Sequence, residues 1–497
     1  MRHLFKLPLF VIAGLFLHHC AGTYQPKSIV SPEEMLSHQI DRHISIPELQ
    51  TALVGVMVQS AKTGEILYQH NANTLMMPAS NEKIVTAIAA LLKLGPDFRY
   101  RTEIYTTGQV QDGILDGDLV IVGSGDPTFS YRFCKEHDRM FVFQSWADSL
   151  YSRGIHTING NLIGIDDVFD DELIGYGWTV NNLSYAYSAQ VSGLMFNENK
   201  TQLILNADSS GEYLNLSVFP DFGYIKLQPD ISINAEKTDL SVDRNPETNR
   251  IRIKGKIQPG FRSVENLSIH DPTQYFLAGL KWELIRQGIK IFGDPIHADL
   301  VTGRDKLTEK KSLFTHSSPP FTEVLNILMK ESQNLYAESL VKLLGSKFGN
   351  AGSFSEGAIV VKETLRRLGL NEGSYSFKDG SGLSRYNYIS PAHIVKLLMN
   401  MYYHPYGEVF RQSLPIAGVD GTIGYRLRGT VAQNNVFAKT GTISNVRCLS
   451  GYAMTQDGEP LVFATMFNNF LCSANVVMDV QDRICMLLSS FSRNKLN

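Results

Sequence analysis

Three short motifs place nucleophilic, basic and amide side chains at spacings that could support acyl transfer. Ser80 and Lys83 form an S-x-x-K at the expected start of a helix, so the serine hydroxyl and the lysine amine share one helix face. A lysine in this position can take the serine proton, which is the general requirement for an activated nucleophile. Ser332-Gln333-Asn334 is an S-x-N and Lys439-Thr440-Gly441 is a K-T-G, the two elements that usually complete such a site.

Each motif also occurs elsewhere in the chain, so order and setting must identify the functional set. The competing matches are Ser492 with Lys495, Lys62-Thr63-Gly64, Ser232-Ile233-Asn234, Ser473-Ala474-Asn475 and Ser492-Arg493-Asn494. Lys62 lies at an expected hairpin turn before the serine, and Ser492 lies in the polar tail. Taken alone, Ser80 could be a plain helix N-cap. The three motifs in the required order favour an active site instead.

The chain resembles a known family, the type-4, low-molecular-mass penicillin-binding proteins, which are D-alanyl-D-alanine carboxypeptidases and endopeptidases. Beyond the three motifs, the segments that carry the resemblance are Pro78-Ala79-Ser80, Leu94 to Arg99, Gly125-Asp126-Pro127-Thr128, Asp379 to Arg385, Gly418 to Thr422 and Ala438 to Thr442. Between Lys83 and Ser332 lie 248 residues, which matches the family's large insertion. The resemblance covers nearly the whole chain after its first segment.

The resemblance implies a penicilloyl-serine transferase site with Ser80 as nucleophile and Lys83 as the base for acylation. Ser332 would relay a proton toward the leaving D-alanine, and Asn334 would hold Lys83 and the substrate amide. A free lysine has a pKa of about 10.4, so the pKa of Lys83 must be lowered. Burial and the nearby charge of Lys439 are both expected to act in that direction.

The resemblance also implies how the substrate is held. Lys439 and Thr440, together with Gly441 and Thr442 beside them, would form the strand that meets the terminal carboxylate of a D-alanine. Backbone N–H groups of Ser80 and Thr442 would form the oxyanion hole. The family needs no metal and no organic cofactor.

Three further residues are candidate substrate contacts. In the family a carboxylate from the second domain often reaches the substrate's side-chain amine, in a segment that residues 177–182 and 187–189 resemble. Asn182 stands where Asp is expected, which puts recognition of a diaminopimelate-type amine in doubt, and Tyr187 follows in the same segment. Asp379 opens a Gly/Ser-rich segment for which substrate contact and a simple turn both remain open.

Hydrophobic periodicity predicts the elements that position these residues. Alternation over 53–71 predicts a hairpin with Val54, Val56 and Val58 on one face. Helical spacing predicts helices from Ile84 to a stop at Gly95-Pro96, over Tyr275–Ile289, Phe321–Lys330, Leu335–Leu344 and Ala392–Met401, and around Val476 to Leu487. Strands are expected at Val436–Ala438, Cys448–Met454 and Leu461–Met466. Between 98 and 267 short β-like runs dominate and helical periodicity is scarce.

These elements predict an α/β (α+β) fold. The ends of the chain would form a penicillin-binding transpeptidase-like domain, an antiparallel sheet with flanking helices, and the middle a β-rich two-domain insertion between the first and second motifs. We expect the catalytic domain at 28–97 and 305–497, a second domain at 98–195 and 263–304, and a nested third domain at 196–262.

The composition excludes some classes of binding partner and cofactor from the expectations. The 497 residues are 43% hydrophobic, and 46 Lys and Arg against 49 Asp and Glu give a net charge of −3, so nucleic acid is not an expected partner. There is no C-x-x-C and no H-E-x-x-H, so a metal site is unsupported. The pairing of Cys134, Cys448, Cys472 and Cys485 is left open.

The first segment is typical of a secretory signal over residues 1–22. Arg2 and Lys6 precede an apolar run from Leu7 to Leu17, and small residues follow. The eleven apolar residues are fewer than the ~20 that a spanning helix needs. We therefore expect export to the periplasm. A lipid anchor through Cys20, with peripheral membrane association, is the alternative.

The leading functional hypothesis is a serine D,D-peptidase that acts on peptidoglycan stem peptides, cleaves D,D cross-links and is acylated by β-lactam antibiotics such as penicillin. A serine β-lactamase is the nearest rival, but no convincing glutamate for a deacylating water stands beside the motifs, and such enzymes have a far shorter segment between the first two motifs. A catalytically silent wall-binding scaffold is the other rival, against which the intact motif residues argue.

Overall fold

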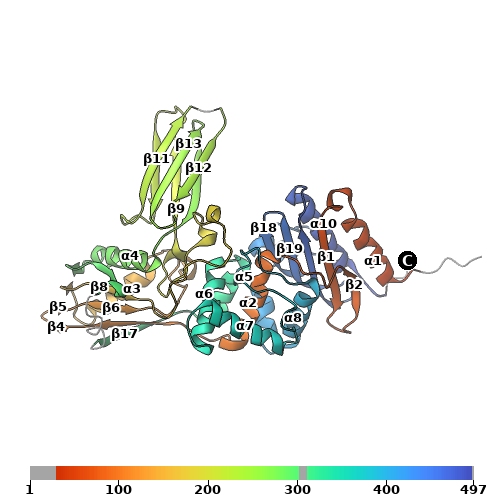
Figure 1. Ribbon diagram of the computed structural model, residues 1–497, viewed down its shortest axis with the longest axis horizontal. Helices are drawn as coiled ribbons and strands as arrows, with labels where there is room; N and C mark the ends of the chain where they lie inside the picture. Colours follow the sequence, from red (N-terminus) through yellow and green to blue (C-terminus); the bar gives the residue numbers. More distant parts are fainter. Residues whose placement is uncertain (1–29, 235, 302–309, 495–497) are drawn as a thin grey trace, which may run out of the picture.

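The computed structural model describes residues 30–234, 236–301 and 310–494, and it confirms a mixed α/β architecture (Figure 1). The chain is elongated, with the N-terminal and C-terminal segments together at one end and a β-rich region at the other. The expected signal, residues 1–22 including Cys20, lies outside the described residues. None of the described helices is both long and apolar enough to cross a membrane.

The first and last parts of the chain share one antiparallel five-stranded sheet. Its order is β18-β19-β20-β1-β2, with β1 at Leu53–Ser60, β2 at Ile66–His70, β18 at Val436–Ile443, β19 at Val446–Met454 and β20 at Pro460–Asn468. The hairpin and the three C-terminal strands are therefore confirmed. Val54, Val56 and Val58 share one face as predicted, packed in a buried cluster that includes residues of α1 (Pro32–Ile44) and α10 (Ala474–Ser490).

Helices cover both faces of this sheet (Figure 1). On one side lie α1 (Pro32–Ile44) and α10 (Ala474–Ser490), and on the other α2 (Glu82–Leu94) and α8 (Pro391–Tyr403). Next to α2 are α5 (Phe321–Lys330), α6 (Asn334–Phe348) and α7 (Phe354–Arg367), and α9 (Gly407–Ser413) packs on α5 and α8. The predicted bounds of α5 are confirmed. The helices α1, α7 and α9 were not predicted.

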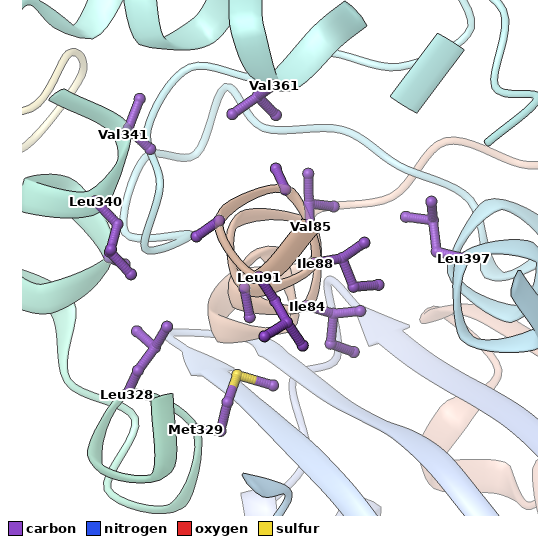
Figure 2. Packing of buried hydrophobic residues seen from close by; sticks show 14 of the residues in the cluster. Ile84, Val85, Ile88, Leu91, Leu328, Met329, Leu340, Val341, Val361 and Leu397 are labelled. Carbon is purple, nitrogen blue, oxygen red and sulfur yellow. The ribbon is translucent and has the colours of Figure 1, made fainter. Parts of the chain in front are cut away.

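Helix α2 is buried on every side, which matters because it carries the candidate base. Figure 2 shows Ile84, Val85, Ile88 and Leu91 of α2 surrounded by side chains of α5, α6, α7 and α8. Full burial of each such side chain contributes roughly 1.5–3 kcal/mol. The helix stops at Gly95, whose φ of 79° is a left-handed value that glycine adopts without strain. A polar side chain on this helix is consequently shielded from water.

The described residues in the middle of the chain form four smaller sheets. Two three-stranded sheets, β10-β9-β14 and β11-β13-β12, pack face to face through Leu203, Leu205, Ile251 and Ile253. The other two have the orders β15-β7-β5-β4 and β16-β8-β6-β3-β17 and are packed by α3 and α4. The bounds are β3 Arg101–Thr106, β4 Gln109–Gln111, β5 Ile114–Asp116, β6 Leu119–Val122, α3 Phe141–Tyr151, β7 Thr157–Ile158, β8 Leu162–Ile165, β9 Lys200–Ala207, β10 Leu214–Phe219, β11 Lys226–Ile233, β12 Asp239–Arg244, β13 Arg250–Ile257, β14 Arg262–Ser268, α4 Pro272–Arg286, β15 Lys290–Ile291, β16 Pro295–His297 and β17 Lys311–Ser317.

In residues 98–267, where helical periodicity is scarce, the described chain has one α-helix, α3, that was not predicted. Its buried residues Val142, Phe143, Trp146, Ala147 and Leu150 do recur at helical spacing. The Phe-Val-Phe start of the segment has high strand propensity, which masked that spacing. Packing of the aromatic face against α4 overrides the local preference.

Candidate active site

Ser80 lies in a tight turn that is clamped by two glycines. It occupies the 3₁₀ turn η2 (Ala79–Asn81) before α2, whose N-cap is Asn81, so Ser80 is not a plain N-cap. Ala79 has a φ of 47°. A Cβ on Gly382 would lie 1.8 Å from the Ala79 carbonyl oxygen, and one on Gly441 would lie 2.4 Å from that of Pro78. Only glycine at these two positions lets the neighbouring loop and strand approach the serine so closely.

The Lys83 ammonium group is fully buried beneath Ser80. Its Nζ is 3.0 Å from Ser80 Oγ, 2.6 Å from Asn334 Oδ1 and 2.8 Å from the Ser381 carbonyl oxygen. The three acceptors occupy the positions of its three donors. The S-x-x-K and S-x-N motifs, 251 residues apart at Lys83 and Asn334, therefore meet through one hydrogen bond.

Burial lowers the pKa of Lys83 to about 7, because the charged form loses its hydration. The carboxyl groups of Asp379, Glu338 and Glu82 oppose this shift by favouring the charged form. The pKa values of Glu82 and Glu338 are themselves raised, first by burial. Lys439 was expected to lower the pKa of Lys83, but the interaction acts on Lys439: burial and then the charge of Lys83 hold the pKa of Lys439 well below its usual range.

The second half of the site joins the S-x-N and K-T-G motifs. Lys439 Nζ donates to Ser332 Oγ at 2.8 Å and to the Thr440 carbonyl oxygen at 3.0 Å. Ser332 has a φ of 59°, a left-handed conformation that a non-glycine residue adopts at a cost. Ser332 precedes α6, and Asn334 is its first residue. The serine hydroxyl is thereby held between the two halves of the site.

A cavity of about 750 Å³ opens over these residues. Its walls include these predicted site residues: Ser80, Asn182, Tyr187, Ser332, Asn334, Thr440, Gly441 and Thr442. Lys83 and Lys439 lie behind the wall, both fully buried. Lys439 was expected to meet the substrate carboxylate directly, and its burial behind Ser332 does not support that contact.

Asn182 and Tyr187 come from the insertion and face the sheet across the cavity. The Tyr187 hydroxyl donates to Asn182 Oδ1 at 3.2 Å, and Asn334 Nδ2 donates to the Tyr187 carbonyl oxygen at 2.8 Å. The side chain of Asn334 thus bonds to Lys83 through its oxygen and to the insertion through its nitrogen. This arrangement places Asn182 in the wall of the cavity.

Asp379, for which substrate contact and a simple turn were both left open, does not line the cavity. Its carboxylate is fully buried and accepts hydrogen bonds from Gly382 N at 2.7 Å, Ser384 N at 2.5 Å, Asn387 Nδ2 at 2.6 Å and Trp178 Nε1 at 2.9 Å. Its four donors leave no acceptor free for a ligand. Asp379 therefore positions the loop that presses Gly382 against the Ser80 turn.

Several cavity residues were not named as candidate site residues, although some of them lie in the segments that carry the family resemblance. The wall also contains Gly177, Thr179, Leu383, Arg385, Thr422, Tyr425, Arg426, Ile443, Ser444, Arg447, Cys448, Met478 and Gln481. Arg447 immediately precedes the predicted strand from Cys448, and period-two alternation would have placed it on the same sheet face as Leu449. No local sequence pattern indicates that this end of the strand faces a cavity.

Two further properties of the described residues bear on the chemistry. They contain no cluster of three or more His, Cys, Asp or Glu side chains that could hold a metal ion. Cys134, Cys448, Cys472 and Cys485 are free thiols, which answers the question of their pairing. Burial raises the pKa of Cys448, whose thiol lies beside the cavity, so it is held as the unreactive protonated form.

Comparison with known proteins adds an independent line of evidence. The model of the D-Ala-D-Ala carboxypeptidase 3 (S13) family matches residues 36–491. A D-alanyl-D-alanine carboxypeptidase of Actinomadura sp. (strain R39) is 33% identical over 478 residues, covering 92% of this chain and 85% of the relative. A D-alanyl-D-alanine carboxypeptidase of Haemophilus influenzae is 28% identical over 427 residues, covering 84% and 85%.

Solved structures agree in fold over nearly the same extent. The crystal structure of penicillin binding protein 4 from Haemophilus influenzae superposes with a TM-score of 0.79 at 26% identity, covering 90% of this chain and 97% of that one. The same protein complexed with a β-lactam gives a TM-score of 0.72 at 25% identity, with the same coverage. The resemblance expected from the motifs therefore extends to the whole fold.

Proposed function

Because the chain belongs to the D-Ala-D-Ala carboxypeptidase 3 (S13) family, we propose that it is a serine D,D-peptidase that removes the terminal D-alanine from peptidoglycan stem peptides. The observation that carries this proposal is the pair of Ser80 and Lys83. A fully buried lysine whose pKa is lowered to about 7 lies 3.0 Å from the serine hydroxyl. Such a lysine is available at neutral pH as a base.

The acylation step follows from this geometry. Neutral Lys83 takes the proton of Ser80 as Oγ forms a bond to the carbonyl carbon of the penultimate D-alanine. Backbone N–H groups of Ser80 and Thr442 are the proposed donors to the oxyanion, and one such donor is typically worth about 2.7–4 kcal/mol. The C–N bond then breaks, the leaving amine receives a proton from Lys83 through Ser332, and an ester on Ser80 remains.

Deacylation reverses the proton transfers with water in place of the amine. Water attacks the ester carbonyl, gives up a proton to Lys83, and the released Ser80 oxygen takes a proton back. Asn334 keeps Lys83 in place through its 2.6 Å hydrogen bond during both steps. Lys439 Nζ donates to Ser332 Oγ at 2.8 Å. The hydroxyl hydrogen of Ser332 therefore points away from the ammonium group of Lys439.

The same chemistry supports two wider activities within this proposal. A D,D cross-link presents the same D-alanyl carbonyl with a larger leaving group, and a cavity of about 750 Å³ has room for one. A β-lactam carries a strained amide that Ser80 would open to a stable acyl-enzyme. The β-lactamase alternative is not favoured, because no described residue that lines the cavity is acidic and could activate a deacylating water.

The cellular location and domain limits are part of the proposal. The secretory pattern of residues 1–22 supports action in the periplasm, where peptidoglycan lies, with a lipid anchor at Cys20 as the alternative. The transpeptidase-like domain would hold two nested inserted domains, as expected. Since β17 (Lys311–Ser317) pairs with β3, we place the return to the catalytic domain after Ser317 and not at residue 305.

Intact mass spectrometry with and without penicillin tests the function. We expect one penicilloyl adduct per chain, mapped by peptide mass to Ser80, and none in Ser80→Ala. Incubation with a pentapeptide that ends in D-Ala-D-Ala should release D-alanine. Rapid turnover of penicillin without D-alanine release would favour a β-lactamase, and the absence of both reactions would favour a silent scaffold. The unlabelled mass also reports the processed N-terminus.

A further inference from the structure

The charged side chains in the described cavity wall are all positive. Among the described residues that line it there is no carboxylate, whereas three arginines, Arg385, Arg426 and Arg447, contribute guanidinium groups. Arg426 is neutralised by Asp482, 2.8 Å away. Arg385 is exposed and donates to the Ser444 carbonyl oxygen at 2.9 Å. Arg447 is half-buried, and it is the one that lies beside the K-T-G strand.

The guanidinium group of Arg447 has a hydrogen-bond donor that no described residue accepts. It lies on β19 directly opposite Thr442 of β18 and donates from Nη1 to Thr442 Oγ1. Its Nε is buried and has no hydrogen-bond partner within the described chain. Burial, together with the charge of Arg426, lowers its pKa. A partly buried guanidinium that forms no ion pair with a described carboxylate carries a desolvation cost that a bound anion would offset.

Lys439, the other cation near the K-T-G strand, is not available for a ligand. Its ammonium group is fully buried, and two of its three donors are used by Ser332 and the Thr440 carbonyl oxygen. The terminal carboxylate of a D-alanine needs both charge and hydrogen-bond donors. The cation that lines the cavity at the correct end of this strand is therefore Arg447.

We propose that Arg447, acting with the Thr442 hydroxyl, receives the C-terminal carboxylate of the substrate, an assignment that rests on the proposed peptidase function. Because Thr442 Oγ1 accepts a hydrogen bond from Arg447, its own hydrogen is free to donate to the carboxylate. The carboxylate would thus meet a hydroxyl donor and a guanidinium side by side. The same pair would receive the carboxylate of a β-lactam.

The test compares two peptides that differ only at the C-terminus, one ending in D-Ala-D-Ala as the free acid and one as its amide. We expect Arg447→Gln to lower kcat/KM for the acid about 10- to 100-fold, the range of a lost charge-assisted bond, and to change kcat/KM for the amide less than about 3-fold. Arg447→Lys should be intermediate for the acid. Arg428→Gln is the matched control, because Arg428 is an exposed arginine that donates to the Gly424 carbonyl oxygen and does not line the cavity.

The outcomes separate this inference from the proposed function. If Arg447→Gln lowers kcat/KM equally for acid and amide, Arg447 only supports the strand and the inference is wrong, although the peptidase function stands. If the unsubstituted protein cleaves neither peptide and takes up no penicillin, the proposed function fails and the inference fails with it. Acylation rates for penicillin and its methyl ester give a second measure, since Arg447→Gln should slow only the free acid.

Discussion

Gln333, the central residue of the S-x-N motif, donates a 2.7 Å hydrogen bond from its side-chain amide to the buried carboxylate of Glu198 in the insertion. Glu198 also accepts from Arg132 Nε and Lys200 Nζ, both at 2.5 Å. Gln333 follows Ser332, whose φ is 59°, and Glu198 itself has a φ of 58°. Each such conformation costs about 1–3 kcal/mol and persists only where the surroundings hold it.

The first prediction concerns this bond. Gln333→Ala should lower the rate of penicillin acylation about tenfold, because Ser332 and Asn334 lose a restraint, while the free energy of unfolding falls by only about 1.5–3 kcal/mol for a bond to a charged group. Stopped-flow acylation and thermal unfolding measure the two effects. Gln412→Ala is the matched control, because Gln412 makes the same 2.7 Å bond to the exposed Glu408. Equal acylation rates in both variants would show that the bond does not position the motif.

The second prediction is a pH profile set by Lys83. Only neutral Lys83 can accept the serine proton, and its pKa is lowered to about 7, so acylation should rise with pH through a midpoint near 7 and level off above. Well below the midpoint the rate should fall about tenfold per pH unit. The measurement is the second-order rate constant for penicillin between pH 5 and 9. A midpoint close to the ordinary lysine value would contradict the assignment of Lys83 as base.

The third prediction separates close approach from backbone strain. Gly382 and Gly458 have φ values of 82° and 79°, but a Cβ on Gly382 would collide with the Ala79 carbonyl oxygen, whereas one on Gly458 has nothing within 4 Å. Gly458→Ala should cost about 1 kcal/mol of the free energy of unfolding and leave acylation unchanged. Gly382→Ala should cost several times more and abolish labelling of Ser80. Similar effects in both variants would mean that the positive φ alone explains why residue 382 is a glycine.

These relationships show which parts of the site local sequence patterns could identify. Helix α5 has the predicted bounds because its apolar residues recur at helical spacing. Ser80 and Lys83 were found because they lie three residues apart. Glu198 has no such signal: it sits in a polar Asn-Glu-Asn segment typical of a loop, 135 residues from Gln333, and only the packing of the insertion on α6 joins the two.

Asp379 shows a limit of a different kind. Its Gly/Ser-rich surroundings and its place in a family-like segment left a ligand contact and a simple turn both open, and the donors that satisfy its carboxylate, among them Trp178, come from its own loop and from a segment 201 residues away. A sequence cannot reveal that a carboxylate is already satisfied, because that depends on tertiary hydrogen bonds. Residues whose side chains can take part in chemistry can be identified from the sequence. Whether those side chains are exposed to a ligand cannot.

The last prediction concerns the side chain of the stem peptide. Asn182 lines the cavity, its oxygen accepts from Tyr187, and no acidic side chain lies among the described residues of the wall. A free amine on the stem peptide therefore finds no opposite charge, and we expect similar kcat/KM values for muropeptides with that amine free or acetylated. Asn182→Asp should create a preference for the free amine of about tenfold, the scale of one charge-assisted bond. Asn181→Asp, which adds the same charge one residue outside the wall, is the control. If Asn182→Asp and Asn181→Asp leave the ratio of the two substrates equally unchanged, the amine does not reach Asn182.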